Sequence, residues 1–447
     1  MKHCLALAVC ALLSVEARSQ VATEWFKLTL DDPAVGDFFG SAISVSDKYI
    51  AVGVPRRRHS GAAVGVVYVY DLATREIRQV LYAEDGQEFV EFGNAVSVFG
   101  DRVVVGARAH DGAYEKSGAA YVFDALTGQQ IFMLVPSDPA PSHQFGRSVA
   151  LSDRYVVVGA YGDGHAGDFS GAAYVFDLES GIQRGKLVAE DAMKGDQFGV
   201  SVAVSGNLAA IGSYLDDQGD VRSTGSMYIF DIEKGRQISK CVADDAASGD
   251  LLGNDVDIHG SLAIAGAQLR DDVGINSGAA YVFEVMTGQQ VFKLVASDVA
   301  ALDSFGRDVA INDSVAIVGS ISDDDLGFQS GSAYFFDLQS GQQLSKLLAS
   351  DGSGQNSLGE EVAISGTVAL VATPQHNSGA GAVYLYSLPF MDCLPDTNND
   401  GALTPADFSA WVAAFNASAP ACDQNGDGLC TPADFSAWVA NYNAGCS

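Results

Sequence analysis

The sequence contains few basic residues, and its only long apolar run lies at the start. It has 25 Lys and Arg against 56 Asp and Glu, a formal net charge of −31 over 447 residues. This charge disfavours binding to nucleic acid or anionic membranes, both of which require clustered Lys and Arg. After the run from Cys4 to Val15, no stretch of about 18 apolar residues follows, so we expect no transmembrane segment.

Catalytic signatures are also lacking. The sequence has no metalloprotease His motif, no Gly-x-Ser-x-Gly elbow and no phosphate loop, and its His residues are scattered. We therefore expect no catalytic residues and no enzymatic activity. Residues 1–19 have the pattern of a secretory signal peptide: Lys2 and His3, the apolar run, and a small-residue cleavage site ending at Ala17. We expect an exported protein.

Cysteine is rare outside the two ends of the chain. Four of the seven Cys crowd the C-terminal segment: Cys393, Cys422, Cys430 and Cys446. An even set in a short exported segment predicts two disulfides, with three possible connectivities. We favour Cys393 with Cys446, which would join the two ends of the segment, and Cys422 with Cys430.

A pair formed by a large apolar residue and Gly recurs at intervals of 53 or 54 residues. The seven pairs are Phe39-Gly40, Phe92-Gly93, Phe145-Gly146, Phe198-Gly199, Leu252-Gly253, Phe305-Gly306 and Leu358-Gly359. Each repeat contains four short runs of alternating polarity, rich in β-branched and aromatic residues, which predict antiparallel strands. Between the first two runs we expect a two-residue turn, such as Ser152-Asp153 or His259-Gly260.

Tandem four-stranded units predict a β-propeller, an all-β fold. Residues 25–30 resemble a fourth strand with no partner before it, whereas the last repeat ends after its third strand, at 383–386. Pairing the two completes a seventh blade and closes the ring. An open solenoid, the alternative, would need capping units that the sequence lacks. We predict a seven-bladed propeller over residues 20–389.

Three further positions are constant within the repeats. Every third strand has a Tyr: Tyr68, Tyr121, Tyr174, Tyr228, Tyr281, Tyr334 and Tyr384, each three residues after a Gly. Every Phe-Gly or Leu-Gly pair follows an Asp by seven residues: Asp32, Asp85, Asp138, Asp191, Asp245, Asp298 and Asp351. We expect a buried Tyr whose hydroxyl finds a partner, a Gly that allows close packing, and an Asp that fixes a turn. Cys241 replaces a Leu of the other repeats, so we expect it to be buried and unpaired.

The succession of Phe-Gly, Val-Gly-Ala and Gly-Ala-Ala-Tyr-Val-Phe resembles FG-GAP repeats, known from integrin α-subunit propellers and many exported bacterial proteins. The resemblance covers about residues 25–388. It implies a propeller that serves as an interaction surface. Integrin-type repeats often hold calcium between the first and second strands; the short turns here imply that those sites are absent.

Acidic residues gather in the loops between second and third strands, which leave a propeller on one face. They are Asp163, Asp168, Asp216, Asp217, Asp220, Asp271, Asp272, Asp323, Asp324 and Asp325. Three interpretations are open: a solvated polar rim, a ligand- or cation-binding face, or a pair of catalytic carboxylates.

Residues 390–447 form a different module. Two segments repeat at an offset of 27 residues, each with Asp-x-Asn-x-Asp-Gly and a further Asp at position 12. This is the ligand pattern of an EF-hand calcium loop. The module has six charged side chains from residue 393 on, all Asp at positions 1, 5 or 12. We predict two Ca²⁺ ions, held by Asp396, Asn398, Asp400, Ala402, Thr404 and Asp407, and by Asp423, Asn425, Asp427, Leu429, Thr431 and Asp434.

The runs that follow the two loops predict short helices with Phe and Trp directed inward. Paired loops with Asp at position 12 resemble a dockerin, so the module is identified as a small α-helical, paired EF-hand module of that type. The resemblance implies attachment to a cohesin-like or envelope partner. However, Pro405-Ala406 and Pro432-Ala433 stand where cohesin-binding dockerins often have polar residues.

Together these features predict a secreted or surface-attached, non-catalytic binding or adhesion protein. Its propeller would bind an extracellular protein or polysaccharide, and its calcium-loaded module would attach it to a cell surface or assembly. One alternative is an extracellular polysaccharide hydrolase or lyase that uses the acidic loops. Another is a structural surface-layer component.

Overall fold

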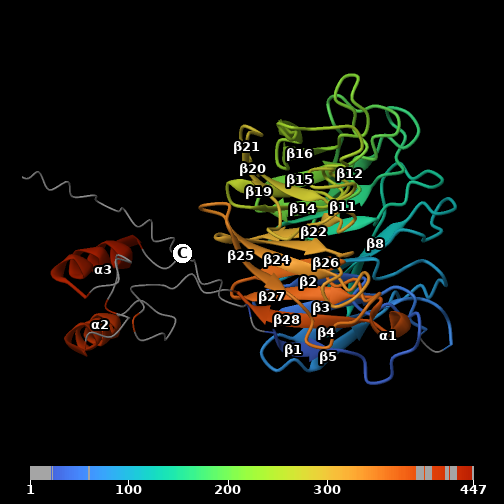
Figure 1. Cartoon of the computed structure of the whole chain (residues 1–447). Helices are drawn as coiled ribbons and strands as arrows, with labels where there is room; N and C mark the ends of the chain where they lie inside the picture. The colour runs from blue at the N-terminus through green and yellow to red at the C-terminus, as the bar shows by residue number, and fades with distance from the viewer. Residues whose placement is uncertain are drawn as a thin grey trace, which may run out of the picture.

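The computed structural model describes residues 22, 24–58, 61–388, 397, 405–417, 422 and 430–444; the expected signal peptide, 1–19, lies outside them. Seven four-stranded antiparallel sheets form the blades of a propeller (Figure 1). The first strands of neighbouring blades contact one another around the ring and enclose its axis.

The strands of blades 1–4 follow in chain order: β2 (Ala42–Val45), β3 (Tyr49–Val54), β4 (Val66–Asp71) and β5 (Ile77–Leu81); β6 (Ala95–Phe99), β7 (Arg102–Ala107), β8 (Ala119–Asp124) and β9 (Gln130–Leu134); β10 (Ser148–Leu151), β11 (Tyr155–Ala160), β12 (Ala172–Asp177) and β13 (Gln183–Leu187); β14 (Val202–Ser205), β15 (Leu208–Ser213), β16 (Ser226–Asp231) and β17 (Arg236–Cys241). Blades 5–7 contain β18 (Val256–His259), β19 (Leu262–Ala267), β20 (Ala279–Glu284) and β21 (Gln290–Leu294); β22 (Phe305–Ile311), β23 (Val315–Ser320), β24 (Ser332–Asp337) and β25 (Gln343–Leu347); and β26 (Glu361–Ser365), β27 (Val368–Thr373), β28 (Ala382–Ser387) and β1 (Glu24–Leu28).

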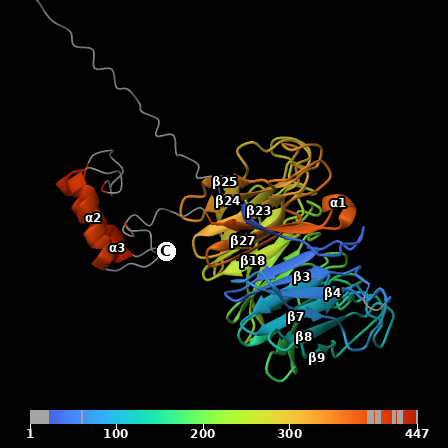
Figure 2. The same ribbon diagram turned by 90° about the horizontal axis from the view of Figure 1, so that it is seen from below.

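The ring is closed by β1, which is the fourth strand of blade 7. It pairs antiparallel with β28, with Lys27 opposite Tyr384 and Leu28 opposite Val383. Figures 1 and 2 show blue N-terminal strands beside orange C-terminal ones. The predicted closure is therefore confirmed, and the open solenoid is wrong. Closure pairs an edge that would otherwise expose unpaired backbone groups.

The repeated Phe-Gly pairs form the joints between blades. Phe145 is fully buried, and its backbone forms a parallel bridge with Gly118 of the preceding blade. Gly118 has φ +86°, and a Cβ there would lie 2.0 Å from the Phe145 carbonyl oxygen. Only Gly allows this approach. The Phe145 ring then packs edge-on against Tyr174, 5.6 Å between centroids, within its own blade.

The first hairpin of each blade differs in part from the expected two-residue turn. In four blades two residues connect the strands, and Gly is the first of them: Gly100, Gly206, Gly260 and Gly366, all with positive φ; the expected turn Gly206-Asn207 is confirmed. The turn in blade 5 is thus Gly260-Ser261, one residue later than expected. In blade 3 a longer loop joins Leu151 to Val156, because the Ser152 hydroxyl accepts the Tyr155 N–H at 3.1 Å.

Cys241 occupies the repeat position at which the other repeats have Leu. It is fully buried, it is a free thiol, and it stands opposite Met227 at the end of β17. Burial raises the pKa of this thiol to about 12. It is therefore an apolar core residue at neutral pH, as predicted.

The described part of the C-terminal segment contains two helices, α2 (Pro405–Ala417) and α3 (Pro432–Ala444). Trp411 and Trp438 are buried, as expected, but Phe408 and Phe435 remain 39% and 44% exposed. The expectation that both Phe side chains point inward is thus wrong in part. They still contact the opposite helix, with 5.2 Å between the Phe408 and Trp438 rings.

The disulfide between Cys422 and Cys430 is present, and Trp411 Nε1 donates to the Cys422 carbonyl at 3.1 Å. The other expected disulfide, Cys393–Cys446, falls outside the described residues. No helix among the described residues is long and apolar enough to cross a membrane.

Candidate functional site

One face of the propeller carries the long connections, and we call it the loop face. It bears the loops between second and third strands and those from each fourth strand to the next blade. The acidic residues predicted there fall into two groups. Asp168, Asp217 and Asp324 are exposed, whereas Asp163, Asp216 and Asp323 are almost fully buried.

The buried group belongs to a polar network that is clearest in blade 3. The Tyr174 hydroxyl donates to Asp138 and Asp163, both at 2.8 Å. The Lys186 ammonium donates to the same carboxylates at 2.8 and 2.7 Å. Burial alone would raise the pKa of Asp163, but hydrogen bonds from Lys186 and Tyr174 outweigh burial and lower it. In this network one ammonium thus bonds two carboxylates, the buried Asp163 and the half-exposed Asp138.

The Asp seven residues before each Phe-Gly pair was expected to fix a turn, and its contacts show a different role. It receives the Tyr hydroxyl of its blade in five blades: Tyr121 to Asp85, Tyr174 to Asp138, Tyr228 to Asp191, Tyr281 to Asp245 and Tyr384 to Asp351. The repeated Tyr and Asp are therefore partners across a blade. The expected partner for the Tyr hydroxyl is confirmed, and this Asp accepts its hydrogen bond.

The network changes composition between blades. Where blade 3 has Asp163 and Lys186, blade 2 has His110 and Met133. His110 Nε2 lies 2.8 Å from Asp85 and is its polar partner in this blade. In blade 2 the Lys and the second Asp are thus both absent, which avoids a buried carboxylate without a cation.

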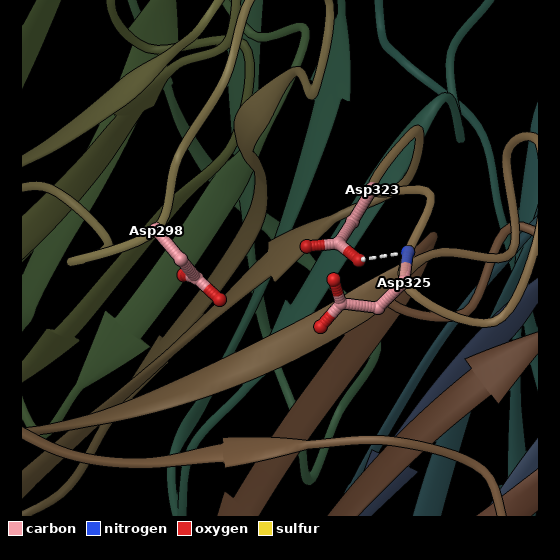
Figure 3. A group of neighbouring side chains, drawn as sticks. All are labelled: Asp298, Asp323 and Asp325. Carbon is pink, nitrogen blue, oxygen red and sulfur yellow. Dashed lines mark hydrogen bonds between the residues drawn. The ribbon is translucent and has the colours of Figure 1, made fainter.

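Blade 6 has the densest acidic group. Asp298, Asp323 and Asp325 direct carboxylate oxygens at one point, all within 4.8 Å of one another (Figure 3). The Lys346 ammonium is 2.9, 2.7 and 2.7 Å from these three carboxylates. The Lys346 ammonium therefore occupies the position that a bound metal cation would take. This contact favours the polar-rim interpretation over a cation-binding rim here.

Known proteins were compared with this chain. Seven consecutive segments match the FG-GAP repeat: residues 23–70, 77–123, 129–176, 182–230, 236–283, 289–336 and 342–386. The chain belongs to the FG-GAP repeat family. No match is found among curated proteins. Each FG-GAP segment runs from a fourth strand to the third strand of the next blade, so sequence repeat and blade are offset by one strand.

The axis of the FG-GAP propeller is a channel of about 290 Å³, lined by the first strands of all blades. Asp255, Asp308 and Glu361 occupy one repeat position on blades 5–7, where blades 1–4 have Ala or Ser. Water reaches these side chains in part, but protein surrounds them. Burial and the Asp255 charge raise the pKa of Glu361 to about 8, and that of Asp308 also lies well above its usual range.

Sequence reasoning missed these channel acids. The available signal was the change from small residues to Asp and Glu at one repeat position. Several of them hold neighbouring blades together: Asp255 accepts the Val309 N–H at 3.0 Å, Asp257 that of Ile311 at 2.9 Å, and Asp308 that of Val362 at 2.6 Å. These donors lie on the innermost strands, which have no further strand to pair with.

Three of the twelve predicted calcium ligands fall within the described residues. Asp407 and Asp434 lie in the first turns of α2 and α3, and both are fully buried. Asp434 accepts the N–H of Thr431 at 2.7 Å, so it also caps α3. The other nine lie outside the described residues: Asp396, Asn398, Asp400, Ala402, Thr404, Asp423, Asn425, Asp427 and Leu429.

Proposed function

We propose that this FG-GAP protein is an exported, non-catalytic binding protein. Its loop face contacts an extracellular protein or polysaccharide. Its C-terminal module, loaded with Ca²⁺, attaches it to a cell surface or assembly through a cohesin-like or envelope partner. A binding or interaction role follows from the seven-bladed FG-GAP propeller itself.

The observation that carries the proposal is the apolar character of the loop tips. Phe89, Ile275, Leu302 and Phe328 all lie on loop-face connections and are 70%, 67%, 60% and 69% exposed. Exposed large apolar side chains on one face can contact a partner. The buried carboxylates beneath them are held by Lys, which supports a non-catalytic role. Glycoside hydrolysis would need two carboxyl groups free to exchange protons.

The test is a panel of polysaccharides and extracellular proteins, scored for both retention and turnover. We expect the wild-type protein to bind at least one member without releasing reducing ends or unsaturated products. Replacement of Phe89 and Ile275 by Ser should weaken retention of a protein ligand, while Val80→Ser, on the outer strand β5, should not. Release of product by the wild type would overturn the non-catalytic proposal.

For the module, the chemistry of the donors fits calcium. Asp407 and Asp434 are buried carboxylates, each at position 12 of a loop whose other side-chain donors are Asp, Asn and Thr oxygens. Ca²⁺ prefers such hard oxygen ligands, and it would balance part of the negative charge. Asp434 also caps α3, because its carboxylate accepts the N–H of Thr431, another predicted ligand of the second calcium loop.

Calorimetric titration of the full chain with Ca²⁺ tests this part. We expect two ions per wild-type chain and one in either Asp407→Asn or Asp434→Asn. Asp168→Asn, which removes an exposed carboxylate on the loop face, is the control and should leave the uptake at two. Uptake that is absent in the wild type, or unchanged in both variants, would refute the calcium sites.

A further inference from the structure

Blade 7 departs from the repeat on the loop face. The large apolar residue of the Phe-Gly or Leu-Gly pair precedes the third-strand Tyr by 29 or 30 residues in six blades, but Leu358 precedes Tyr384 by only 26. The shortened loop has no acidic residue and contains a short helix, α1 (His376–Gly379). Residues that repeat in every blade maintain the architecture, so a feature confined to one blade is a candidate for a functional role.

A pocket of about 560 Å³ opens beside this loop, between blades 6 and 7. We call it the amide pocket, because four exposed side-chain amides line it, those of Gln329, Gln355, Gln375 and Asn377, together with the buried amide of Asn356. All four residues are exposed, and their amides make no hydrogen bond to other described residues. Ser378 and Glu360 complete the polar wall. Each amide thus has both a donor and an acceptor available.

The backbone that carries these amides is held in place. Gln355 N–H donates to the Phe328 carbonyl at 2.7 Å, which joins the loops of the two blades. Beneath them Asn356 is buried, and its side-chain amide lies 3.1 Å from His376 Nδ1. His376 Nε2 is 3.0 Å from the Lys27 ammonium on β1, and burial together with Lys27 lowers the pKa of His376. The backbone of the pocket is therefore held in place, which reduces the backbone entropy lost on binding.

The lining selects a class of ligand. Side-chain amides bond groups that both donate and accept, and sugar hydroxyls are such groups. Among the described residues no cation lines the pocket, Lys27 beneath His376 pairs with Asp351 at 2.6 Å, and Arg307 faces Glu360 at 3.8 Å, so an anionic ligand is disfavoured. A sugar ring presents hydroxyls at its edge and C–H groups on its face.

We propose that the amide pocket binds an uncharged sugar unit of an extracellular polysaccharide. This inference rests on the proposed binding function and names the ligand class of one site on the loop face. The amides would bond the hydroxyls, and Glu360 would accept from a further hydroxyl.

The test uses the full chain and affinity electrophoresis in gels that contain a neutral glucan, a neutral mannan or a polyuronate. We expect wild-type migration to be retarded by at least one neutral polymer and not by the polyuronate. In the double variant Gln355→Ala/Gln375→Ala the affinity should fall about tenfold or more, since each lost hydrogen bond contributes about 1 kcal/mol.

The matched control is Ser142→Ala, which alters the position in blade 3 that corresponds to Gln355 and should bind like the wild type. Thermal unfolding of every variant verifies that the propeller is intact. Absence of retardation by neutral polymers, retardation only by the polyuronate, or unchanged binding in the double variant would each overturn the sugar site. Binding of a protein ligand would survive those outcomes. Product release would instead overturn the proposed function.

Discussion

Lys346 provides the sharpest test of the loop-face network, because three carboxylates depend on it. Its ammonium lies within 2.9 Å of Asp298, Asp323 and Asp325. Burial alone would lower the pKa of Lys346, but hydrogen bonds to the three carboxylates outweigh burial and raise it. Lys346→Met removes the charge while keeping a long apolar side chain of the kind that Met133 provides in blade 2.

The size of the effect follows from how deeply each carboxylate is buried. The side chains of Asp298 and Asp325 are 44% and 52% exposed, so each of these pairs contributes about 0.5 kcal/mol. The Asp323 side chain is only 4% exposed and would be left as an uncompensated buried charge. Breaking such a pair costs about 3 kcal/mol. We therefore expect the melting temperature of the propeller to fall by about 5 °C or more.

The assay is thermal unfolding of the full chain at neutral pH, followed by far-UV circular dichroism. Lys194→Met, which breaks an exposed pair with Asp168, is the control and should leave the melting temperature unchanged. Adding Asp323→His to Lys346→Met recreates the blade 2 arrangement of Asp85, His110 and Met133, and should recover at least half of the loss. Ca²⁺ should stabilise the single variant, whose three carboxylates then lack a cation.

Equal melting temperatures for Lys346→Met and the wild type would refute the reasoning. So would a double variant less stable than the single one, since the blade 2 arrangement would then not be transferable.

Two further predictions concern the channel and the closure of the ring. Between pH 6.5 and 8.5 stability should fall with rising pH, by on the order of 3 kcal/mol, because the channel acids with raised pKa values lose protons only in the folded state. Urea unfolding at pH 6.5 and 8.5 measures this change in stability. Glu361→Gln should remove much of the difference in stability between the two pH values, whereas Glu179→Gln, at an exposed position, should remove none of it. A wild-type protein that is equally stable at both pH values would contradict the prediction. Deleting residues 22–30 removes β1 and should abolish cooperative unfolding, because β28 would lose its outer partner; an unchanged single transition would show that β1 is dispensable.

Much of the fold could be predicted because its determinants are local and periodic. The spacing of Phe-Gly pairs, the alternating runs and the unmatched strand at each end predicted the blade, the number of blades and their closure. Cys241 could be placed because its repeat equivalents are all Leu. Turns such as Gly260-Ser261 lie one residue later than expected because several turn-forming residues are adjacent in the sequence. The register of the paired strands determines which two of them form the turn.

The sites were less predictable. Asp163 and Asp323 looked like loop acids, and nothing in their own neighbourhood in the sequence indicated that Lys186 and Lys346, 23 residues later, would neutralise them. The channel acids Asp255 and Glu361 are more than 100 residues apart, and their mutual repulsion exists only once the ring is closed.

The secondary structure, the seven-fold repetition and the calcium-loop pattern can be predicted from the sequence, since they depend on residue type and short spacings. The pairing of charges, the group of acids in the channel and the departure of blade 7 from the repeat are visible only in the tertiary structure. The physical reason is that Coulomb interactions, burial and pocket shape depend on distances in space, and closure of a ring brings together residues from every part of the chain.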